Sequence, residues 1–237
     1  MVPECPVGQR AWPVVAPEKG RSGGRVLHLS TVSITDVIFL VMPRRPVPVR
    51  ERLLDAADNL LFVDGAYATP VDVILREAEA SPPSLYSHFG SKQGLIAAAL
   101  RRRLEIWTRT WDEAIDAAEG ARGRLLAVYP ALRRYQGVFL TERWCAFTGT
   151  TAGITDPGPE LAEVLADERR LLSERHEELC AALLGPGPEA DALARRLVIA
   201  YGGTIVLMLR DPWREAIDDG EATAGALVDA AHVGAPA

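Results

Sequence analysis

Apolar side chains recur along most of this chain at the three- to four-residue spacing of an amphipathic helix. The first apolar stripe consists of Leu53, Ala57, Leu60 and Leu61, and a helix-stop signal, Asp64-Gly65, follows it. After residue 42, no segment shows a convincing alternation of apolar and polar residues. The pattern therefore predicts an all-α fold.

Two short helices are predicted between residues 69 and 89. Thr69 is expected to cap the first helix and Pro70 to occupy its first position, where a missing N–H costs nothing. The apolar stripe of this helix consists of Val71, Ile74, Leu75 and Ala78.

The second short helix is expected after Ser81, which can cap a helix that opens with Pro82 and Pro83. Leu85 and Phe89 lie four positions apart, so both should pack inward onto the first helix. Two short amphipathic helices joined by a tight turn form a helix-turn-helix.

A long helix is predicted from Lys92, with Ser91 as its cap and one buried stripe through Leu100, Leu104, Trp107 and Trp111. Further helices are expected over residues 123–136, 142–151, 160–184, 189–210 and 212–231. The pattern divides the chain into a three-helix domain over residues 46–106, with its helix-turn-helix at about 69–89, and a helical bundle over residues 107–237.

Residues 1–45 are rich in proline and glycine and lack helical periodicity, which predicts a disordered leader. A short β-branched segment over residues 32–41 can form only an isolated strand. Met42 stands directly before a basic segment, and our hypothesis is that translation begins there.

Charge is unevenly distributed along the chain, whose net charge is −6. Residues 43–103 contain nine basic and seven acidic side chains, whereas residues 104–237 contain 13 basic and 22 acidic ones. Any contact with nucleic acid is therefore expected in the first of these parts.

Cysteine spacing and hydropathy indicate where in the cell the protein works. Cys5, Cys145 and Cys180 are scattered, which favours a reducing cytoplasm over secretion. The uncharged run over residues 197–209 is shorter than the roughly 18 to 20 residues that a spanning helix needs, so we interpret it as a buried helix and expect no membrane partner.

Four segments carry a resemblance to a known family: Arg52–Ala57, Phe62–Gly65, Thr69–Val71 and, above all, Ser84–Lys92. With their spacing, they resemble the DNA-binding domain of TetR-family transcriptional regulators. The resemblance implies a homodimer that binds double-stranded operator DNA and a C-terminal domain that binds a small-molecule effector. The rest of the chain is similar to the family only in being helical, acidic and of suitable length.

One position departs from the family pattern. Family members usually have glycine in the turn where Glu79 stands, and a bulkier apolar residue in place of Ala80. If the backbone there needs a positive φ, Glu79 costs about 1 kcal/mol relative to glycine.

The resemblance also implies which residues contact DNA. The residues expected to hold phosphates are Tyr86, His88 and Lys92, with Thr69 offering its hydroxyl and the helix N-terminus to the DNA backbone. Those nearest the base edges would be Pro83, Ser84 and Ser87. From composition alone, Tyr86 and His88 are equally explained as ordinary, partly buried side chains.

Arg, Asn and Gln, which contact guanine and adenine bidentately, are missing from the outer face of the second short helix. Base selectivity from this helix should therefore be modest. Our hypothesis is that Arg44, Arg45 and Arg50 supplement it along the DNA backbone or in the minor groove. We expect the basic run at residues 101–103 to be a solvated helix face.

Aromatic residues concentrate in the C-terminal part. The residues proposed for a pocket around a small, mostly apolar ligand are Trp107, Trp111, Tyr129, Phe139, Trp144, Phe147 and Thr148. The alternative is that these side chains simply fill the core.

Gly202 and Gly203 lie inside a predicted helix, where each costs about 1 kcal/mol relative to alanine. Small residues permit another helix to approach closely, so Gly202, Gly203 and Leu207 are assigned to a dimer interface built as a four-helix bundle. Internal packing is the alternative.

The sequence thus predicts a sequence-specific regulator, a repressor that a small apolar ligand releases from DNA. The alternative is a ligand-binding or scaffold protein of the same fold that does not bind an operator. Catalytic, nucleotide-binding and metal-binding motifs are missing, and the four histidines are far apart, so we expect no enzyme activity, cofactor or metal.

Overall fold

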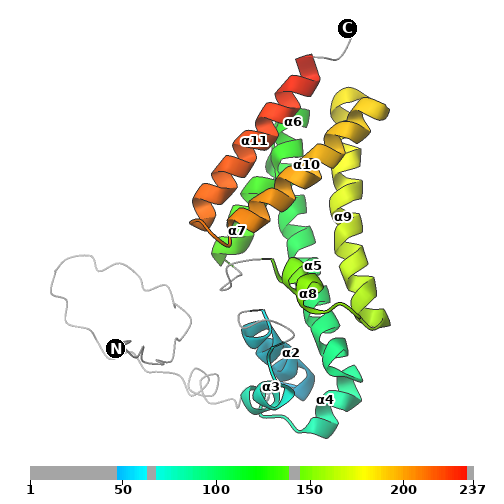
Figure 1. Cartoon of the computed structure of the whole chain (residues 1–237), viewed down its shortest axis with the longest axis vertical. Coiled ribbons are helices and arrows are strands. Elements are labelled where there is room, and N and C mark those ends of the chain that lie inside the picture. Colours follow the sequence, from blue (N-terminus) through cyan, green and yellow to red (C-terminus); the bar gives the residue numbers. More distant parts are fainter. Residues whose placement is uncertain (1–46, 63–67, 139–144, 234–237) are drawn as a thin grey trace, which may run out of the picture. The chain divides into compact units, whose positions relative to one another are not determined.

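The computed structural model describes residues 47–62, 68–138 and 145–233, and the secondary structure within these ranges is helical (Figure 1). The predicted all-α fold is therefore confirmed. The described residues all belong to one compact unit. The predicted leader, the short strand at residues 32–41 and the start at Met42 lie outside the described residues.

Three short helices open the compact unit: α2 (Val49–Leu60), α3 (Val71–Glu77) and α4 (Pro82–Phe89). They pack around side chains that are wholly inaccessible to solvent, including Leu53, Ile74 and Leu85. Helices α3 and α4 occupy the segment that the sequence predicted as a helix-turn-helix.

The predicted cap of the first short helix is wrong by one residue. Helix α3 begins at Val71, and Pro70 is its N-cap residue. Thr69 is buried, with only 4% of its surface exposed, and its hydroxyl donates a hydrogen bond to the carbonyl of Leu60 at 3.5 Å. Thr69 therefore fastens the chain entering α3 to the end of α2.

The turn between α3 and α4 needs a left-handed residue, as the glycine that the family usually has there suggested. Glu79 has a φ of +47°, a positive value that no other non-glycine residue in the described ranges has. The N–H of Ala80 donates to the carbonyl of Leu75 at 2.9 Å, and the N–H of Glu79 donates to the carbonyl of Arg76 at 3.2 Å. These two bonds form a Schellman motif, which usually places glycine where Glu79 stands.

We expect Glu79→Gly to stabilise the protein by about 0.5 to 1 kcal/mol, because glycine adopts a positive φ without a Cβ clash. Thermal unfolding at a fixed protein concentration should show a melting temperature higher by about 1 to 4 °C. Glu79→Ala keeps the Cβ atom and serves as the control, with a melting temperature near that of the wild type. A lower melting temperature for Glu79→Gly would show that the glutamate side chain itself stabilises the turn.

Helix α5 (Lys92–Ala117) is long and begins as predicted. The hydroxyl of Ser91 accepts a hydrogen bond from the N–H of Gly94 at 3.0 Å, which confirms Ser91 as its cap. α5 contacts α2 and α4, and it also contacts α6, α7 and α9. It therefore connects the N-terminal helices with the C-terminal ones.

The C-terminal part consists of α6 (Gly120–Leu126), α7 (Val128–Val138), α8 (Ala146–Gly153), α9 (Pro159–Leu184), α10 (Pro188–Leu207) and α11 (Trp213–Val233). The pairs α9–α10 and α10–α11 pack side by side (Figure 1). None of the helices within the described ranges combines the length and hydropathy that crossing a membrane would require.

The single helix predicted over residues 123–136 is wrong, because α6 and α7 are separate and the first begins at Gly120. Pro130 has no N–H to donate to the carbonyl four residues earlier, at Leu126, so the helical hydrogen-bond ladder is interrupted there. The N–H of Ala127 bonds instead to the carbonyl of Arg124, three residues back, at 3.2 Å.

Buried apolar side chains form two clusters that meet on α5. The N-terminal cluster combines α2, α3, α4 and the beginning of α5 with residues of α8 and α9, among them Phe147 and Leu161. The C-terminal cluster combines the later part of α5, from Trp107, with α6, α7, α9, α10 and α11. Leu104 packs against both clusters. A displacement of α5 therefore alters the packing of both.

Candidate nucleic-acid interface and ligand cavity

Helix α4 has one apolar and one polar face. Leu85 is fully buried and Phe89 is 8% exposed, so both anchor the helix as predicted. Tyr86, by contrast, is 55% exposed. The other exposed candidates are Pro83, Ser87 and His88, and Ser84 is half-buried. The structure thus brings these candidates together on one accessible surface. The alternative that Tyr86 and His88 are partly buried does not hold, because both are exposed.

The first turn of α4 is held by a side-chain contact that the sequence did not predict. Ser81 is the N-cap residue and is followed by two prolines, but its side chain does not accept a backbone N–H. Its Oγ lies 3.0 Å from the Oγ of Ser84, within hydrogen-bond distance. The orientation of the Ser84 hydroxyl is therefore linked to Ser81.

Two basic residues lie near the C-terminal end of α4. Lys92 is the first residue of α5, and partial burial lowers the pKa of its ammonium group. The guanidinium carbon of Arg50 lies 5.6 Å from the centroid of the Phe89 ring, and the same side chain pairs with Glu51 at 3.0 Å. Arg44 and Arg45 lie outside the described residues.

Arg52 fastens the turn of the helix-turn-helix to α2. Its Nε donates to the carbonyl of Ala78 at 2.9 Å, and a terminal nitrogen donates to the carbonyl of Glu79 at 3.0 Å. A cation at the C-terminal end of α3 also interacts favourably with the helix dipole. The sequence marked Arg52 only through the family resemblance, because periodicity gives no signal for a contact 26 positions away.

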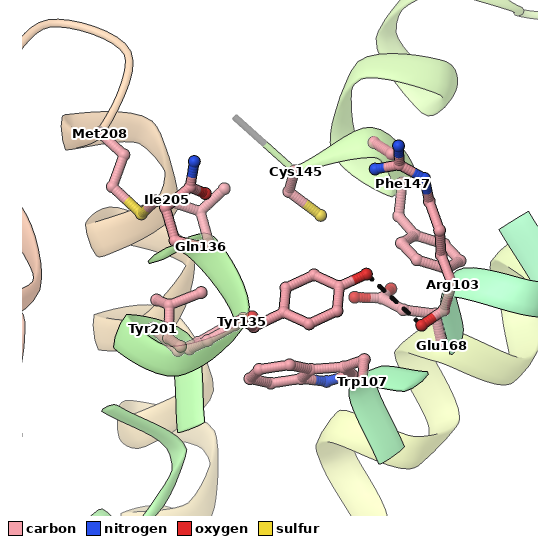
Figure 2. A pocket seen from close by; sticks show the side chains of 12 residues that line it. Arg103, Trp107, Tyr135, Gln136, Cys145, Phe147, Glu168, Tyr201, Ile205 and Met208 are labelled. Atoms are coloured by element: carbon pink, nitrogen blue, oxygen red, sulfur yellow. Dashed lines mark hydrogen bonds between the residues drawn. The ribbon is translucent and has the colours of Figure 1, made fainter. Parts of the chain in front are cut away.

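A small cavity lies among α5, α7, α9 and α10 (Figure 2). Its volume is about 30 Å³, and its lining includes Arg103, Trp107, Tyr135, Cys145, Glu168 and Tyr201. This is room for about one or two water molecules, whereas pockets for drug-sized ligands measure about 300 to 1,000 Å³. A larger ligand therefore requires the walls to move.

Two residues that the sequence predicted for a pocket, Trp107 and Phe147, line this cavity. Tyr135 lines it as well, and so do Glu168 and Tyr201, which sequence reasoning missed. Tyr135 belongs to the aromatic-rich segment that suggested a pocket. Glu168 and Tyr201 lie far from it along the chain, and only the packing of α9 and α10 brings them there.

The other predicted pocket residues lie elsewhere. Trp111 and Tyr129 are almost fully buried in the C-terminal cluster and are not part of the cavity lining, so the alternative of core filling describes them. Thr148 is exposed on α8. Phe139 and Trp144 lie outside the described residues.

Burial dominates the electrostatics of the cavity. It raises the pKa of the Glu168 carboxyl to about 7, although the nearby Arg169 acts in the opposite direction. Burial, together with the charge of Glu168, also raises the pKa of the Cys145 thiol. The pKa of the Tyr201 hydroxyl is well above its ordinary value for the same reasons. Near neutral pH, Glu168 is therefore the group in this set that changes its charge.

The basic run at residues 101–103 is not a solvated face, so that expectation is wrong. Arg103 is only 7% exposed, and its Nε donates to the carboxylate of Asp58 at 2.8 Å. Arg102 pairs with the same carboxylate and with Asp55 at 2.8 Å. Successive residues of a helix point about 100° apart, so three consecutive arginines cannot share one face. The result is an ionic link between α5 and the end of α2.

Arg103 also belongs to the cavity. The residue lines the wall, and its backbone carbonyl accepts a hydrogen bond from the hydroxyl of Tyr135 at 3.4 Å (Figure 2). One residue therefore contacts the cavity on one side and α2 on the other.

Helix α10 exposes apolar surface. Ile199 is 73% exposed, Val206 46% and Leu207 39%. Gly202 and Gly203 lie exposed between them, and a Cβ atom added to either would meet no other atom within 4 Å. Internal packing therefore does not account for this face.

A metal site has no support in the described ranges, where no group of three or more His, Cys, Asp or Glu residues is suited to hold a metal ion. His176 is almost fully buried, and its Nδ1 lies 2.7 Å from the carbonyl oxygen of Leu172. Its burial lowers the pKa of the imidazole, which is the behaviour of a packed core residue.

Residues 53–99 match the family model described as "Bacterial regulatory proteins, tetR family". This segment begins in α2 and ends in α5, so it contains the whole helix-turn-helix and the turn at Glu79. No curated protein matches the chain.

Solved structures are similar over most of the chain. A TetR-family transcriptional regulator from Streptomyces coelicolor is 22% identical with a TM-score of 0.69, and the match covers 78% of this chain and 96% of that one. The regulatory protein TetR from Rhodobacter sphaeroides is 19% identical with a TM-score of 0.63, covering 76% and 98%. The reduced form of NemR from E. coli is 19% identical with a TM-score of 0.62, covering 76% and 97%. These similarities show that the chain has the fold of TetR-family transcriptional regulators.

Proposed function

Residues 53–99 belong to the tetR family of bacterial regulatory proteins, and from this premise we propose that the chain is a homodimeric, cytoplasmic transcriptional regulator. It binds a specific operator in double-stranded DNA as a repressor, and a small ligand releases it. The observation that carries this proposal is the accessible polar face of α4, on a helix whose apolar face is buried at Leu85 and Phe89.

Helix α4 is the element that enters the major groove, which is wide enough for an α-helix. Pro83, Ser84 and Ser87 lie nearest the base edges, while Tyr86, His88 and Lys92 hold phosphates. Thr69 is left out of this set, because its buried hydroxyl bonds to the end of α2. Base selectivity from this face is modest, and Arg50, beside the C-terminal turn of α4, supplements it.

Dimerisation uses the exposed apolar face of α10, together with α11, to form a four-helix bundle with a second copy. The exposure of Ile199, Val206 and Leu207 supports this assignment, and the two glycines between them permit close helix approach. A dimer places two copies of α4 about one DNA turn apart, near 34 to 36 Å, as two half-sites require.

Release follows from the position of Arg103. A ligand that enlarges the cavity must displace part of its wall, and Arg103 in that wall holds Asp58 on α2. Helix α2 also carries Arg52, which fastens the turn between α3 and α4. A ligand that prefers a conformer with a shifted α2 therefore lowers the population that fits the operator.

A mobility-shift assay with the DNA upstream of the chain's own gene, at two salt concentrations, tests the proposal. A regulator should shift this DNA at low salt and bind it more weakly at high salt, because phosphate contacts release counterions. A folded protein that shifts the DNA at neither salt concentration would favour the alternative, a ligand-binding or scaffold protein without an operator.

We expect Lys92→Ala to weaken operator binding and to reduce the slope of log affinity against log salt by about one unit, the value for one lost phosphate contact. Arg124→Ala is the matched control, since it removes one positive charge from the exposed surface of α6, away from α4. Its slope should equal that of the wild type. Equal slopes for all three proteins would remove Lys92 from the interface.

A further inference from the structure

We propose that the cavity takes a ligand with a cationic group on a small apolar body, and that Glu168 is the counterion that selects it. This inference rests on the proposed ligand-controlled regulation and specifies the chemistry of the effector.

Glu168 is a carboxyl group in a mainly aromatic wall. The centroid of the Trp107 ring lies 5.4 Å from that of Tyr135 and 6.2 Å from that of Tyr201, so three rings from three helices surround one side of the cavity. Figure 2 shows Glu168 on the side of the Tyr135 hydroxyl, and Cys145 and Phe147 also line the space. Aromatic faces attract cations, and the attraction grows when the site excludes water.

The charges of the cavity wall favour a cation over an anion. Arg103 is the basic residue of the lining, but its guanidinium is already paired with the carboxylate of Asp58. Glu168 forms no salt bridge with the described residues, and Arg169, on its own helix, is the cation that affects its ionisation. A ligand therefore meets one acidic group whose charge the protein does not balance within the cavity.

Ionisation of Glu168 and binding of a cation should reinforce each other. The other titratable groups in the cavity lining are Arg103 on α5, Tyr135 on α7, Cys145 before α8 and Tyr201 on α10. Because burial raises the pKa of Glu168 to about 7, much of the population is protonated near neutral pH. A bound cation favours the carboxylate, so its affinity should rise as the pH increases from 6 to 8.

The small volume of the cavity links ligand entry to a change of shape. With about 30 Å³ available, a ligand ring displaces wall side chains such as the flexible thioether of Met208. Ligand binding and the open conformation are therefore coupled.

Three probes that share a benzyl group test the charge preference on the full-length protein: benzyltrimethylammonium, benzyl alcohol and phenylmethanesulfonate. Tryptophan fluorescence and titration calorimetry report their binding. We expect the ammonium probe to bind at least about tenfold more tightly than the other two, and more tightly at pH 8 than at pH 6.

Two variants of α9 test whether Glu168 causes the charge preference and the pH dependence. Glu168→Gln keeps the shape and should abolish both the charge preference and the pH dependence, whereas Glu174→Gln, an exposed position on the same helix, should retain them. The inference is overturned if no probe binds, if the neutral or anionic probe binds as tightly as the cation, or if Glu168→Gln keeps the preference. The mobility-shift assay on the same preparations reports operator binding independently, so loss of that activity would reject the proposed function and not the ligand chemistry.

Discussion

A protein in which Gly203 is replaced by leucine is expected to sediment as a monomer and to bind its operator at least about a hundredfold more weakly. Two linked binding modules gain about 10² to 10⁴ in overall affinity from simultaneous engagement, and a monomer loses that gain. Analytical ultracentrifugation and the mobility-shift assay measure the two effects on the same sample.

The structure separates this effect from misfolding. A Cβ atom at Gly203 meets nothing within 4 Å in its own subunit, so leucine there clashes only with a second copy. Leucine is also a better helix former than glycine by nearly 1 kcal/mol, which favours α10 itself.

Two control variants test the interface assignment. Gly203→Ala should preserve the dimer because it adds little volume, and Ala182→Leu should preserve it because Ala182 is exposed on a different helix, α9. A dimeric Gly203→Leu protein would show that α10 does not form the interface.

The second large effect concerns the link between α2 and α5. Asp58→Ala should lower the free energy of unfolding by about 3 kcal/mol, since removing one partner of a buried ion pair costs roughly 3 to 5 kcal/mol. The Arg103 side chain is only 9% exposed and has Asp58 as a charged partner at 2.8 Å. Urea unfolding at a fixed protein concentration measures the loss.

Asp55→Ala is the matched control, because Asp55 lies on the same helix and also pairs with Arg102. Its side chain is 59% exposed, so its removal should cost less than about 1 kcal/mol. Adding Arg103→Met to Asp58→Ala should recover most of the lost stability, because an apolar side chain at this buried position needs no ionic partner. Equal losses for Asp55→Ala and Asp58→Ala would mean that burial of the pair does not matter.

Local features of the fold were predictable from the sequence. Ser91 caps α5, and Leu85 and Phe89 anchor α4, because capping and helical periodicity depend on neighbouring residues. The family resemblance also pointed to the positive φ at Glu79, because family members usually have glycine there. In contrast, the cap predicted at Thr69 was wrong, because Pro70 is the N-cap residue and the Thr69 hydroxyl bonds to a carbonyl nine positions away.

Features that depend on distant segments could not be predicted in this way. Arg103 pairs with a residue 45 positions earlier. In the sequence, no periodicity distinguishes it from Arg101 and Arg102. The cavity combines Trp107 with Glu168 and Tyr201, which only the packing of three helices brings together. The break between α6 and α7 was also missed, but its signal is local, because Pro130 lacks the N–H that a continuous helix would need there.

The unbroken length of α5 has a geometric consequence. Its 26 residues extend for about 39 Å, so a rotation of about 5° about one end displaces the other by roughly 3 Å. In a two-fold symmetric dimer the two displacements add, and the separation of the DNA-facing ends changes by roughly 6 to 7 Å, about two base-pair steps. An angular adjustment too small to disrupt any helix would thus put the protein out of phase with its two half-sites.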